Sequence, residues 1–321
     1  MHKVTTRFIF SLFQLLIILN LSSCAQNQTT STTTSSINQI KDNNDDEVLT
    51  TNTFKDVEKK VLEILKNNKP SDILVVLDID NTILKMPQPL GSDQWFVHHA
   101  DLMKNSACRP LCLTTDFNEL LKIQGKLYFL SGMVPPEPEI PSILKKIQNE
   151  KVPFLVLTSR GSDFYSTTLR ELERNQYSFG QNALGSSIGG TFIPFTQENY
   201  KDFKLSEDDW NLLKLKEARP VLYQNGVFMT SGMHKGVMLK YILNKFNQSY
   251  KYIVFVDDHE KHTNNMQVIM KDLTSMITFR YGQVDNEVQS FKNLKEKEHI
   301  NLNKQWEKID QVSKQFLKMP Y

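Results

Sequence analysis

Short apolar runs, each followed by polar residues, mark the strands expected in this chain. The clearest run is Ile73–Leu77, whose Val- and Ile-rich composition predicts a strand buried on both faces. Pro153–Leu157 and Tyr252–Val256 have the same character, and Met276–Phe279 predicts a further strand. Between these runs the apolar spacing changes to the helical period. Strands that alternate with helices predict an α/β fold with a mainly parallel sheet and helices on both faces.

The helical spacing predicts seven helices after residue 53, and Asp163 is expected to cap the fourth of them. In chain order, the expected ranges are Phe54–Asn68, Glu119–Tyr128, Ile140–Gln148, Asp163–Asn175, Leu205–Lys216, Lys235–Phe246 and Asn301–Leu317.

Two long segments interrupt the alternation, one at 86–136 and the other at 178–232. Each is far longer than the usual connection of about 2–6 residues, so we expect both to cover a functional site. Within the second segment, alternating residues around Asn225-Gly226 predict a hairpin. We therefore expect this insertion to consist of a hairpin and a helix.

The N-terminus differs from the rest of the chain. Residues 1–23 combine two basic residues with the apolar run Phe8–Leu21, which is typical of a signal peptide and short for a membrane span. The sequence Leu21-Ser22-Ser23-Cys24 resembles the lipidation site of bacterial lipoproteins, with Cys24 as the lipidated residue. That resemblance implies an exported chain anchored by lipid, in the outer membrane facing the periplasm if the cell has one. An ordinary signal peptide with an incidental cysteine is the alternative.

Residues 24–52 are predicted to be a disordered tether, because Ser, Thr, Asn, Gln and Asp dominate them. The folded core is then expected over 53–321. Apart from Lys3 and Arg7, the 38 basic and 36 acidic residues all lie after the signal peptide, so the mature chain is nearly neutral. This balance argues against a nucleic-acid partner. Cys108 and Cys112 could close a small disulfide loop in an oxidising compartment, or remain free.

Polar clusters follow three of the predicted strands. Asp78-Ile79-Asp80-Asn81-Thr82 follows the first, Thr158-Ser159-Arg160 the second and Asp257-Asp258 the third, while Lys235 begins the preceding helix. The carboxyl ends of parallel strands lie at the edge where α/β proteins bind ligands. Taken singly, these acids are also typical of turns, Thr158 of a helix N-cap and Lys235 of a lysine-rich surface. Together they predict an active site.

This order of motifs resembles the haloacid dehalogenase (HAD) superfamily from Lys69 to Tyr281. The resemblance implies a Rossmannoid fold with cap insertions and, for most members, phosphoryl transfer. Gly91–Phe96 further resembles an uncharacterised bacterial family of exported HAD-like lipoproteins. We therefore expect an exported Mg²⁺-dependent phosphatase.

The resemblance implies a role for each motif residue. Asp78 would attack phosphorus and form an aspartyl-phosphate, while Asp80 would act as acid and base. A divalent cation is needed because a phosphate dianion repels a carboxylate nucleophile. The other implied roles are catalytic contacts to phosphoryl oxygens by Thr158 and Lys235, substrate contacts by Thr82, Ser159 and Arg160, and Mg²⁺ binding by Asp78, Asp80, Asp257 and Asp258. Asn81 stands where many members have Gly, and Asn tolerates left-handed backbone angles.

The expected substrate is a phosphorylated small molecule, such as a nucleotide or a sugar phosphate. A catalytically silent lipoprotein that binds a partner or contacts a host, and a phosphotransferase, are the alternatives. Further candidates for substrate contact are His98, His99 and His234. Trp95-Phe96 is expected either to wall the site or to pack in the core.

Overall fold

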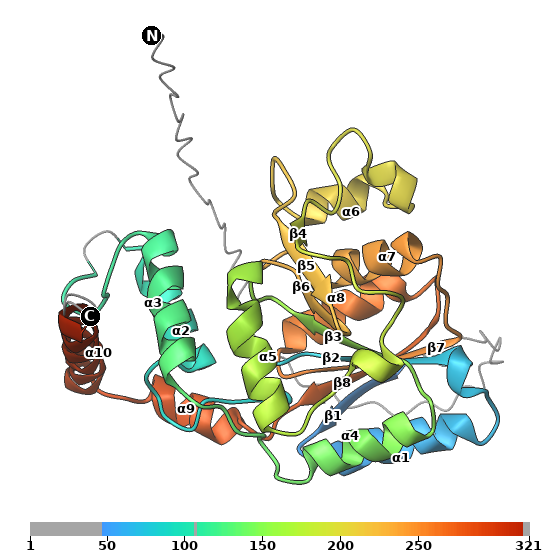
Figure 1. The fold of residues 1–321 in the computed structure, drawn as a ribbon, viewed down its shortest axis with the longest axis horizontal. Coiled ribbons are helices and arrows are strands. Elements are labelled where there is room, and N and C mark those ends of the chain that lie inside the picture. Colours follow the sequence, from blue (N-terminus) through green and yellow to red (C-terminus); the bar gives the residue numbers. More distant parts are fainter. Residues whose placement is uncertain (1–46, 106–107, 317–321) are drawn as a thin grey trace, which may run out of the picture. The chain divides into compact units, whose positions relative to one another are not determined.

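Eight strands form one central sheet in the computed structural model, which describes residues 47–105 and 108–316 (Figure 1). The strand order is β1-β8-β7-β2-β3-β6-β5-β4. The strands are β1 (Glu47–Thr51), β2 (Ile73–Leu77), β3 (Phe154–Thr158), β4 (Thr191–Phe192), β5 (Val221–Gln224), β6 (Val227–Met229), β7 (Tyr252–Asp257) and β8 (Ser275–Tyr281).

In this order the strands pair parallel from β1 to β6, whereas the pairs β6–β5 and β5–β4 are antiparallel. β2 lies at its centre, where Leu77 aligns with Val156 of β3 and with Val256 of β7. This register brings the polar residues after β2, β3 and β7 to one edge. The α/β class and the mainly parallel sheet predicted from the sequence are thereby confirmed.

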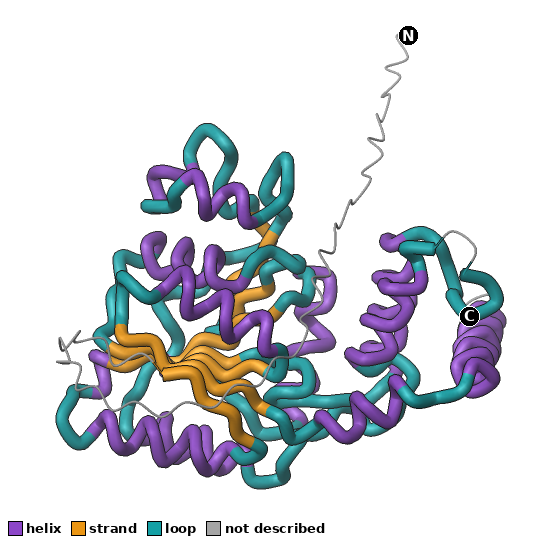
Figure 2. Tube along the Cα trace, turned by 180° about the vertical axis from the view of Figure 1, so that it is seen from behind, coloured by secondary structure: helices purple, strands orange, loops and turns teal. Residues whose placement is uncertain are grey.

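Helices cover both faces of this sheet, which explains why β2 and β3 are buried along their full length (Figure 2). The helices α1 (Phe54–Leu65), α4 (Ile140–Asn149) and α5 (Tyr165–Arg174) pack against one face. The opposite face is covered by α6 (Glu207–Leu212), α7 (Lys235–Lys245) and α8 (Glu260–Met270). The fold is thus doubly wound and Rossmann-like.

A second group of helices lies beside the sheet, and we call it the helical unit (Figure 1). It comprises α2 (Asp93–Leu102), α3 (Phe117–Leu130), α9 (Asp285–Lys292) and α10 (Glu296–Phe316). Its own core contains Trp95, Leu120 and Trp306. A disulfide joins Cys108 to Cys112 between α2 and α3. The insertion 86–136 and the C-terminal helix therefore build one unit.

Three sequence predictions need correction. The predicted tether 24–52 extends too far, because Glu47–Thr51 form the edge strand β1, parallel to β8. The hairpin of the 178–232 insertion extends the main sheet, since β6 pairs with β3. Asp163 caps no helix: it lies in a 3-10 turn, and α5 begins two residues later. The predicted signal peptide and Cys24 lie outside the described residues.

Among the helices described in residues 47–105 and 108–316, none combines the length and apolar character that crossing a bilayer requires.

Candidate active site

The carboxylate of Asp78 lies at the end of β2 beside a buried lysine. Lys235, the first residue of α7, donates to Asp78 Oδ1 at 2.5 Å and to Asp257 Oδ2 at 2.6 Å. These three side chains are at most 7% exposed. A buried lysine that pairs with two carboxylates fixes the position of both. β2, α7 and β7 thus bring together residues that are 179 positions apart at most (Asp78 to Asp257).

Thr82 connects the first acidic motif to the last. Its hydroxyl donates to Asp78 Oδ2 at 3.4 Å and accepts the backbone N–H of Asp258 at 3.2 Å. The loop that brings it there passes through Asn81, whose φ of +58° lies in the left-handed region that Asn tolerates. Thr82 is fully buried, so it orients Asp78 and Asp258, whereas the sequence predicted contact with substrate.

Three carboxylates at this edge can hold a metal ion. One oxygen from each of Asp78, Asp257 and Asp258 lies within 4.8 Å of the others. Asp258 Oδ1 is buried and has no hydrogen-bond partner among the described residues. A buried carboxylate oxygen without a partner is costly unless a cation compensates it. Hard oxygen ligands are those that Mg²⁺ prefers, so the residues present fit this ion.

Burial and charge set the protonation of these acids. Burial raises the pKa of Asp78 to about 7, further helped by Asp257 and Asp80 and opposed by Lys235. Burial also raises the pKa of Asp258 well above its usual range. For Asp257 burial acts in the same sense, but the charges of Lys235 and His262 hold its pKa well below the usual range. A bound cation would favour the ionised forms of Asp78 and Asp258.

Asp80 lies in the loop after β2 and pairs with a buried arginine. Arg160 donates through Nε to Asp80 Oδ2 at 2.9 Å and through Nη2 to Oδ1 at 2.7 Å. Tyr128 of α3 also donates to Oδ1, at 3.3 Å. Arg160 therefore holds the expected acid and base of the site, although the sequence predicted that it would bind substrate.

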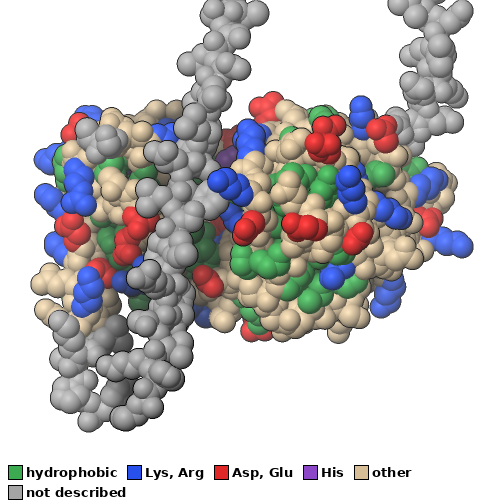
Figure 3. All heavy atoms as spheres, turned by 90° about the horizontal axis from the view of Figure 1, so that it is seen from above, with side chains coloured by type: hydrophobic (Ala, Val, Ile, Leu, Met, Phe, Trp, Pro, Cys, Tyr) green, Lys and Arg blue, Asp and Glu red, His purple; other side chains and the backbone are tan. Residues whose placement is uncertain are grey.

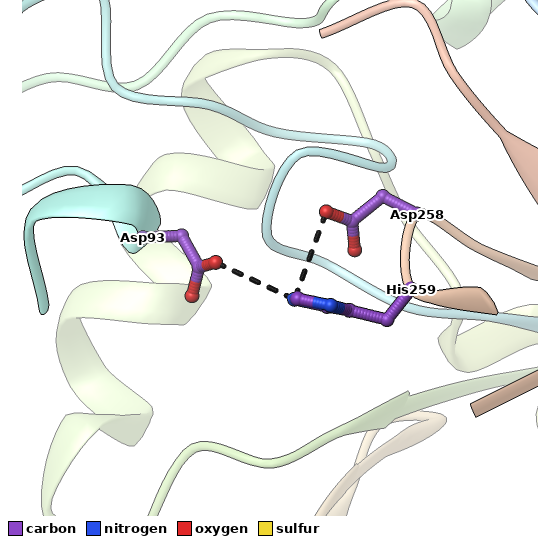
Figure 4. A group of neighbouring side chains, drawn as sticks. All are labelled: Asp93, Asp258 and His259. Atoms are coloured by element: carbon purple, nitrogen blue, oxygen red, sulfur yellow. Dashed lines mark ion pairs between the residues drawn. The ribbon is translucent and has the colours of Figure 1, made fainter. Parts of the chain in front are cut away.

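The N-terminus of α2 reaches the same edge of the sheet. Asp93 Oδ2 lies 3.7 Å from Nε2 of His259, which also lies 3.9 Å from Asp258 Oδ2 (Figure 4). The interaction with Asp93, together with the Asp258 charge, raises the pKa of His259 to about 9 against burial. His262 Nδ1 lies 3.0 Å from Asp257 Oδ1. The first insertion thus touches the site through Asp93 and Tyr128.

Other predicted residues occupy different places. Thr158 is buried at the end of β3, and its hydroxyl oxygen accepts the N–H of Arg160 at 3.2 Å. Ser159 follows it and is exposed. His234 caps α7 by accepting the N–H of Val237.

His98, His99 and Trp95 belong to the helical unit instead of the site. Trp95 is fully buried in its core and lies 4.4 Å from His99 between ring centroids. His98 stacks on His299 of α10, with 4.1 Å between ring centroids. Core packing is therefore the correct alternative for Trp95, and the two histidines join α2 to α10.

Sequence reasoning missed Asp93, Tyr128, His259 and His262. His259 directly follows the last acidic motif and His262 stands three positions later, so their spacing was a usable signal. Asp93 lay within the segment Gly91–Phe96, where it had no assigned role. Tyr128 gave no signal, because its approach to Asp80 depends on how α3 packs.

On the face shown in Figure 3, acidic and basic side chains are interspersed among apolar ones. This agrees with the formal net charge of +2.

Comparison with family models matches residues 50–318 to a family described as "Protein of unknown function (DUF2608)". The match spans the sheet apart from the start of β1, the helical unit and every residue of the site described above. No curated protein matches the chain.

Proposed function

The chain belongs to this family, and from its site we propose that it is a Mg²⁺-dependent phosphatase that hydrolyses phosphomonoesters through an aspartyl-phosphate. One observation above all supports the proposal: Lys235 joins Asp78 to Asp257 while an unpaired oxygen of Asp258 lies in the same cluster. A buried nucleophilic carboxylate, a fixed cation and a cation-binding group are what phosphoryl transfer needs.

In the proposed first step, a carboxylate oxygen of Asp78 attacks phosphorus, and the bond from phosphorus to the ester oxygen breaks. The ester oxygen takes a proton from the carboxyl group of Asp80 and leaves as an alcohol. Lys235 would balance the charge of the phosphoryl oxygens, and Thr158 would donate to one of them.

In the second step, water attacks phosphorus and gives its proton to Asp80. The bond from phosphorus to Asp78 breaks, which releases inorganic phosphate and restores the carboxylate. Bound Mg²⁺ would supply charge neutralisation, so that a phosphate dianion can approach Asp78. Asp78, Asp257, Asp258 and the backbone carbonyl of Asp80 would hold it.

The proposed substrate is a phosphorylated small molecule, such as a nucleotide or a sugar phosphate. Helix α3 places Tyr128 against Asp80, and α2 places Asp93 against His259. The approach of these two helices to the site favours a small ester over a phosphorylated polymer. We further propose that Cys24 carries a lipid, which would anchor the exported chain to the outer membrane facing the periplasm, or to the cell membrane where none exists.

The test is phosphate release by the full chain from a panel of phosphomonoesters, with Mg²⁺ and with a chelator. We expect release that requires Mg²⁺. A folded chain that releases no phosphate from any ester under these conditions would contradict the proposal.

A further inference from the structure

The guanidinium of Arg160 has partners at each of its nitrogens. Nε and Nη2 form the fork on Asp80, Nη1 donates to Thr168 at 2.8 Å, and Nη2 also lies 3.2 Å from the sulfur of Met133. Its side chain is only 4% exposed. Four of its five N–H donors thus have partners within the protein, which leaves little of the guanidinium for a substrate anion. This arrangement is that of a residue that orients another side chain.

Tyr128 completes the arrangement around Asp80. Its ring lies under the guanidinium, 4.4 Å from the ring centroid to the Arg160 Cζ atom. Its hydroxyl donates to the Asp80 oxygen that also accepts from Nη2. The carboxylate of Asp80 is therefore held by three donors, two from the sheet edge and one from α3. The side chain of Asp80 nevertheless remains 18% exposed, so part of it is accessible from outside the protein.

Resting on the proposed phosphatase activity, we propose that Arg160 is a positioning residue for Asp80, and that Tyr128 joins this contact to the helical unit. The planar fork fixes the plane of the carboxylate, which a flexible point charge does not. Proton transfer to a leaving oxygen requires such a fixed direction. Arg160 thus acts on the leaving group through Asp80, without contact with the phosphoryl group.

The test compares two esters that differ in their need for an acid. Glycerol phosphate has an alkoxide leaving group that requires a proton. The leaving group of 2,4-dinitrophenyl phosphate is a phenolate that is stable without one. For both, kcat/KM reports formation of the phosphorylated enzyme and excludes its later hydrolysis. We expect Arg160→Met in the full chain to lower kcat/KM for glycerol phosphate by about 10- to 100-fold, part of the general-acid contribution. The value for the dinitrophenyl ester should change little.

Two further variants grade the effect. Arg160→Lys keeps the charge but loses the fork. Its kcat/KM for glycerol phosphate should therefore lie between the values of the native chain and of Arg160→Met. Tyr128→Phe removes one neutral hydrogen bond and keeps the ring, which predicts a selective loss of about 2- to 10-fold. Arg174→Met on α5 is the matched control, and both esters should react as in the native chain.

Each outcome is decisive. Hydrolysis of the dinitrophenyl ester by Arg160→Met shows that this variant is folded. If Arg160→Met does not fold, the comparison of the two esters is made with Arg160→Lys, whose folding is checked in the same way. An equal loss on both esters would overturn the positioning role, since this result fits a phosphate-binding or purely structural arginine. Failure of the native chain on both esters would instead overturn the proposed function and this inference with it.

Discussion

At the residue scale, the negative charges of the carboxylates in the site outnumber the positive charges of its basic side chains. Three carboxylates, Asp78, Asp257 and Asp258, cluster together, and the buried Lys235 pairs with the first two of them. His262 and His259 lie nearby, but only His259 has a raised pKa. Burying unpaired negative charge is unfavourable, so the cluster favours a bound cation. This is the residue-level reason for proposing Mg²⁺ at this edge.

His99 gives a pH prediction for the helical unit. Burial, with the charges of His98 and His299, lowers its pKa to about 4, and the side chain is 3% exposed. In the unfolded chain His99 has a pKa near 6.5, so between about pH 6.5 and 4 it binds a proton there but not in the folded chain. The free energy of unfolding should fall as the pH drops from about 6.5 to 4, by up to about 3 kcal/mol.

Urea unfolding at pH 7.5 and pH 4.5 measures this effect. His99→Gln should lose less free energy of unfolding between the two pH values than the native chain does. Equal losses in the two chains would show that His99 does not carry the pH dependence.

Site residues could be predicted from the sequence where the local sequence pattern marks them. Asp78, Asp80, Lys235 and Asp257 each stand at the end of an apolar run or the start of a helix, so local pattern places them. The pairing of Arg160 with Asp80 is different, because it joins residues 80 positions apart. No local pattern distinguishes a guanidinium that binds substrate from one that holds a carboxylate.

At the element scale, α10 completes a core that begins 200 residues earlier. Trp306 is buried with Trp95 of α2 and Leu120 of α3, and Lys126 of α3 pairs with Asp310 at 2.8 Å. The sequence indicated the amphipathic helix but not its partner. An apolar face shows that a helix packs, without showing against which element.

Trp306→Ala should lower the free energy of unfolding by about 3–5 kcal/mol, because it removes a large buried ring from this core. Chemical denaturation at neutral pH measures the change. Val312→Ala on the same helix is the matched control, since Val312 is 49% exposed and should cost less than about 0.5 kcal/mol. Equal effects of the two substitutions would show that α10 does not hold the helical unit together.

Strands were predicted well where they are buried on both faces. β2, β3 and β7 are continuous apolar runs, and each was found within one residue of its observed bounds. β1 was missed, since its alternating pattern Glu47–Thr51 continues a polar segment and its burial depends on β8. The hairpin β5–β6 was recognised from Asn225-Gly226, but its place in the sheet comes from pairing with the distant β3.

At the scale of the whole molecule, the two insertions have different uses. The 178–232 segment lengthens the sheet and adds α6, whereas the 86–136 segment reaches the edge with the candidate site through Asp93 and Tyr128. Selectivity for substrate should therefore depend on the helical unit. Length alone suggested that both insertions cover the site, because length does not show where a segment packs.

The proposed lipid anchor is a property of the whole chain, and Cys24→Ser tests it. The native chain should partition with the membrane fraction of a bacterial host and with the detergent phase, because the lipid adds apolar surface. The Cys24→Ser chain should be released into the aqueous phase. Cys108→Ser, which removes a different cysteine, should stay with the membrane. Retention of Cys24→Ser in the membrane would contradict the anchor.

The central claim is that Asp78 is the nucleophile of a metal-dependent phosphatase. Its most direct test is phosphate release by the full chain with Mg²⁺, comparing Asp78→Asn with Asp163→Asn, an exposed residue outside the site. We expect Asp78→Asn to lower release by at least about 10³-fold, as loss of a nucleophile does, while Asp163→Asn and the native chain release phosphate equally. Release by Asp78→Asn at the native rate, or release that a chelator does not stop, would contradict the account.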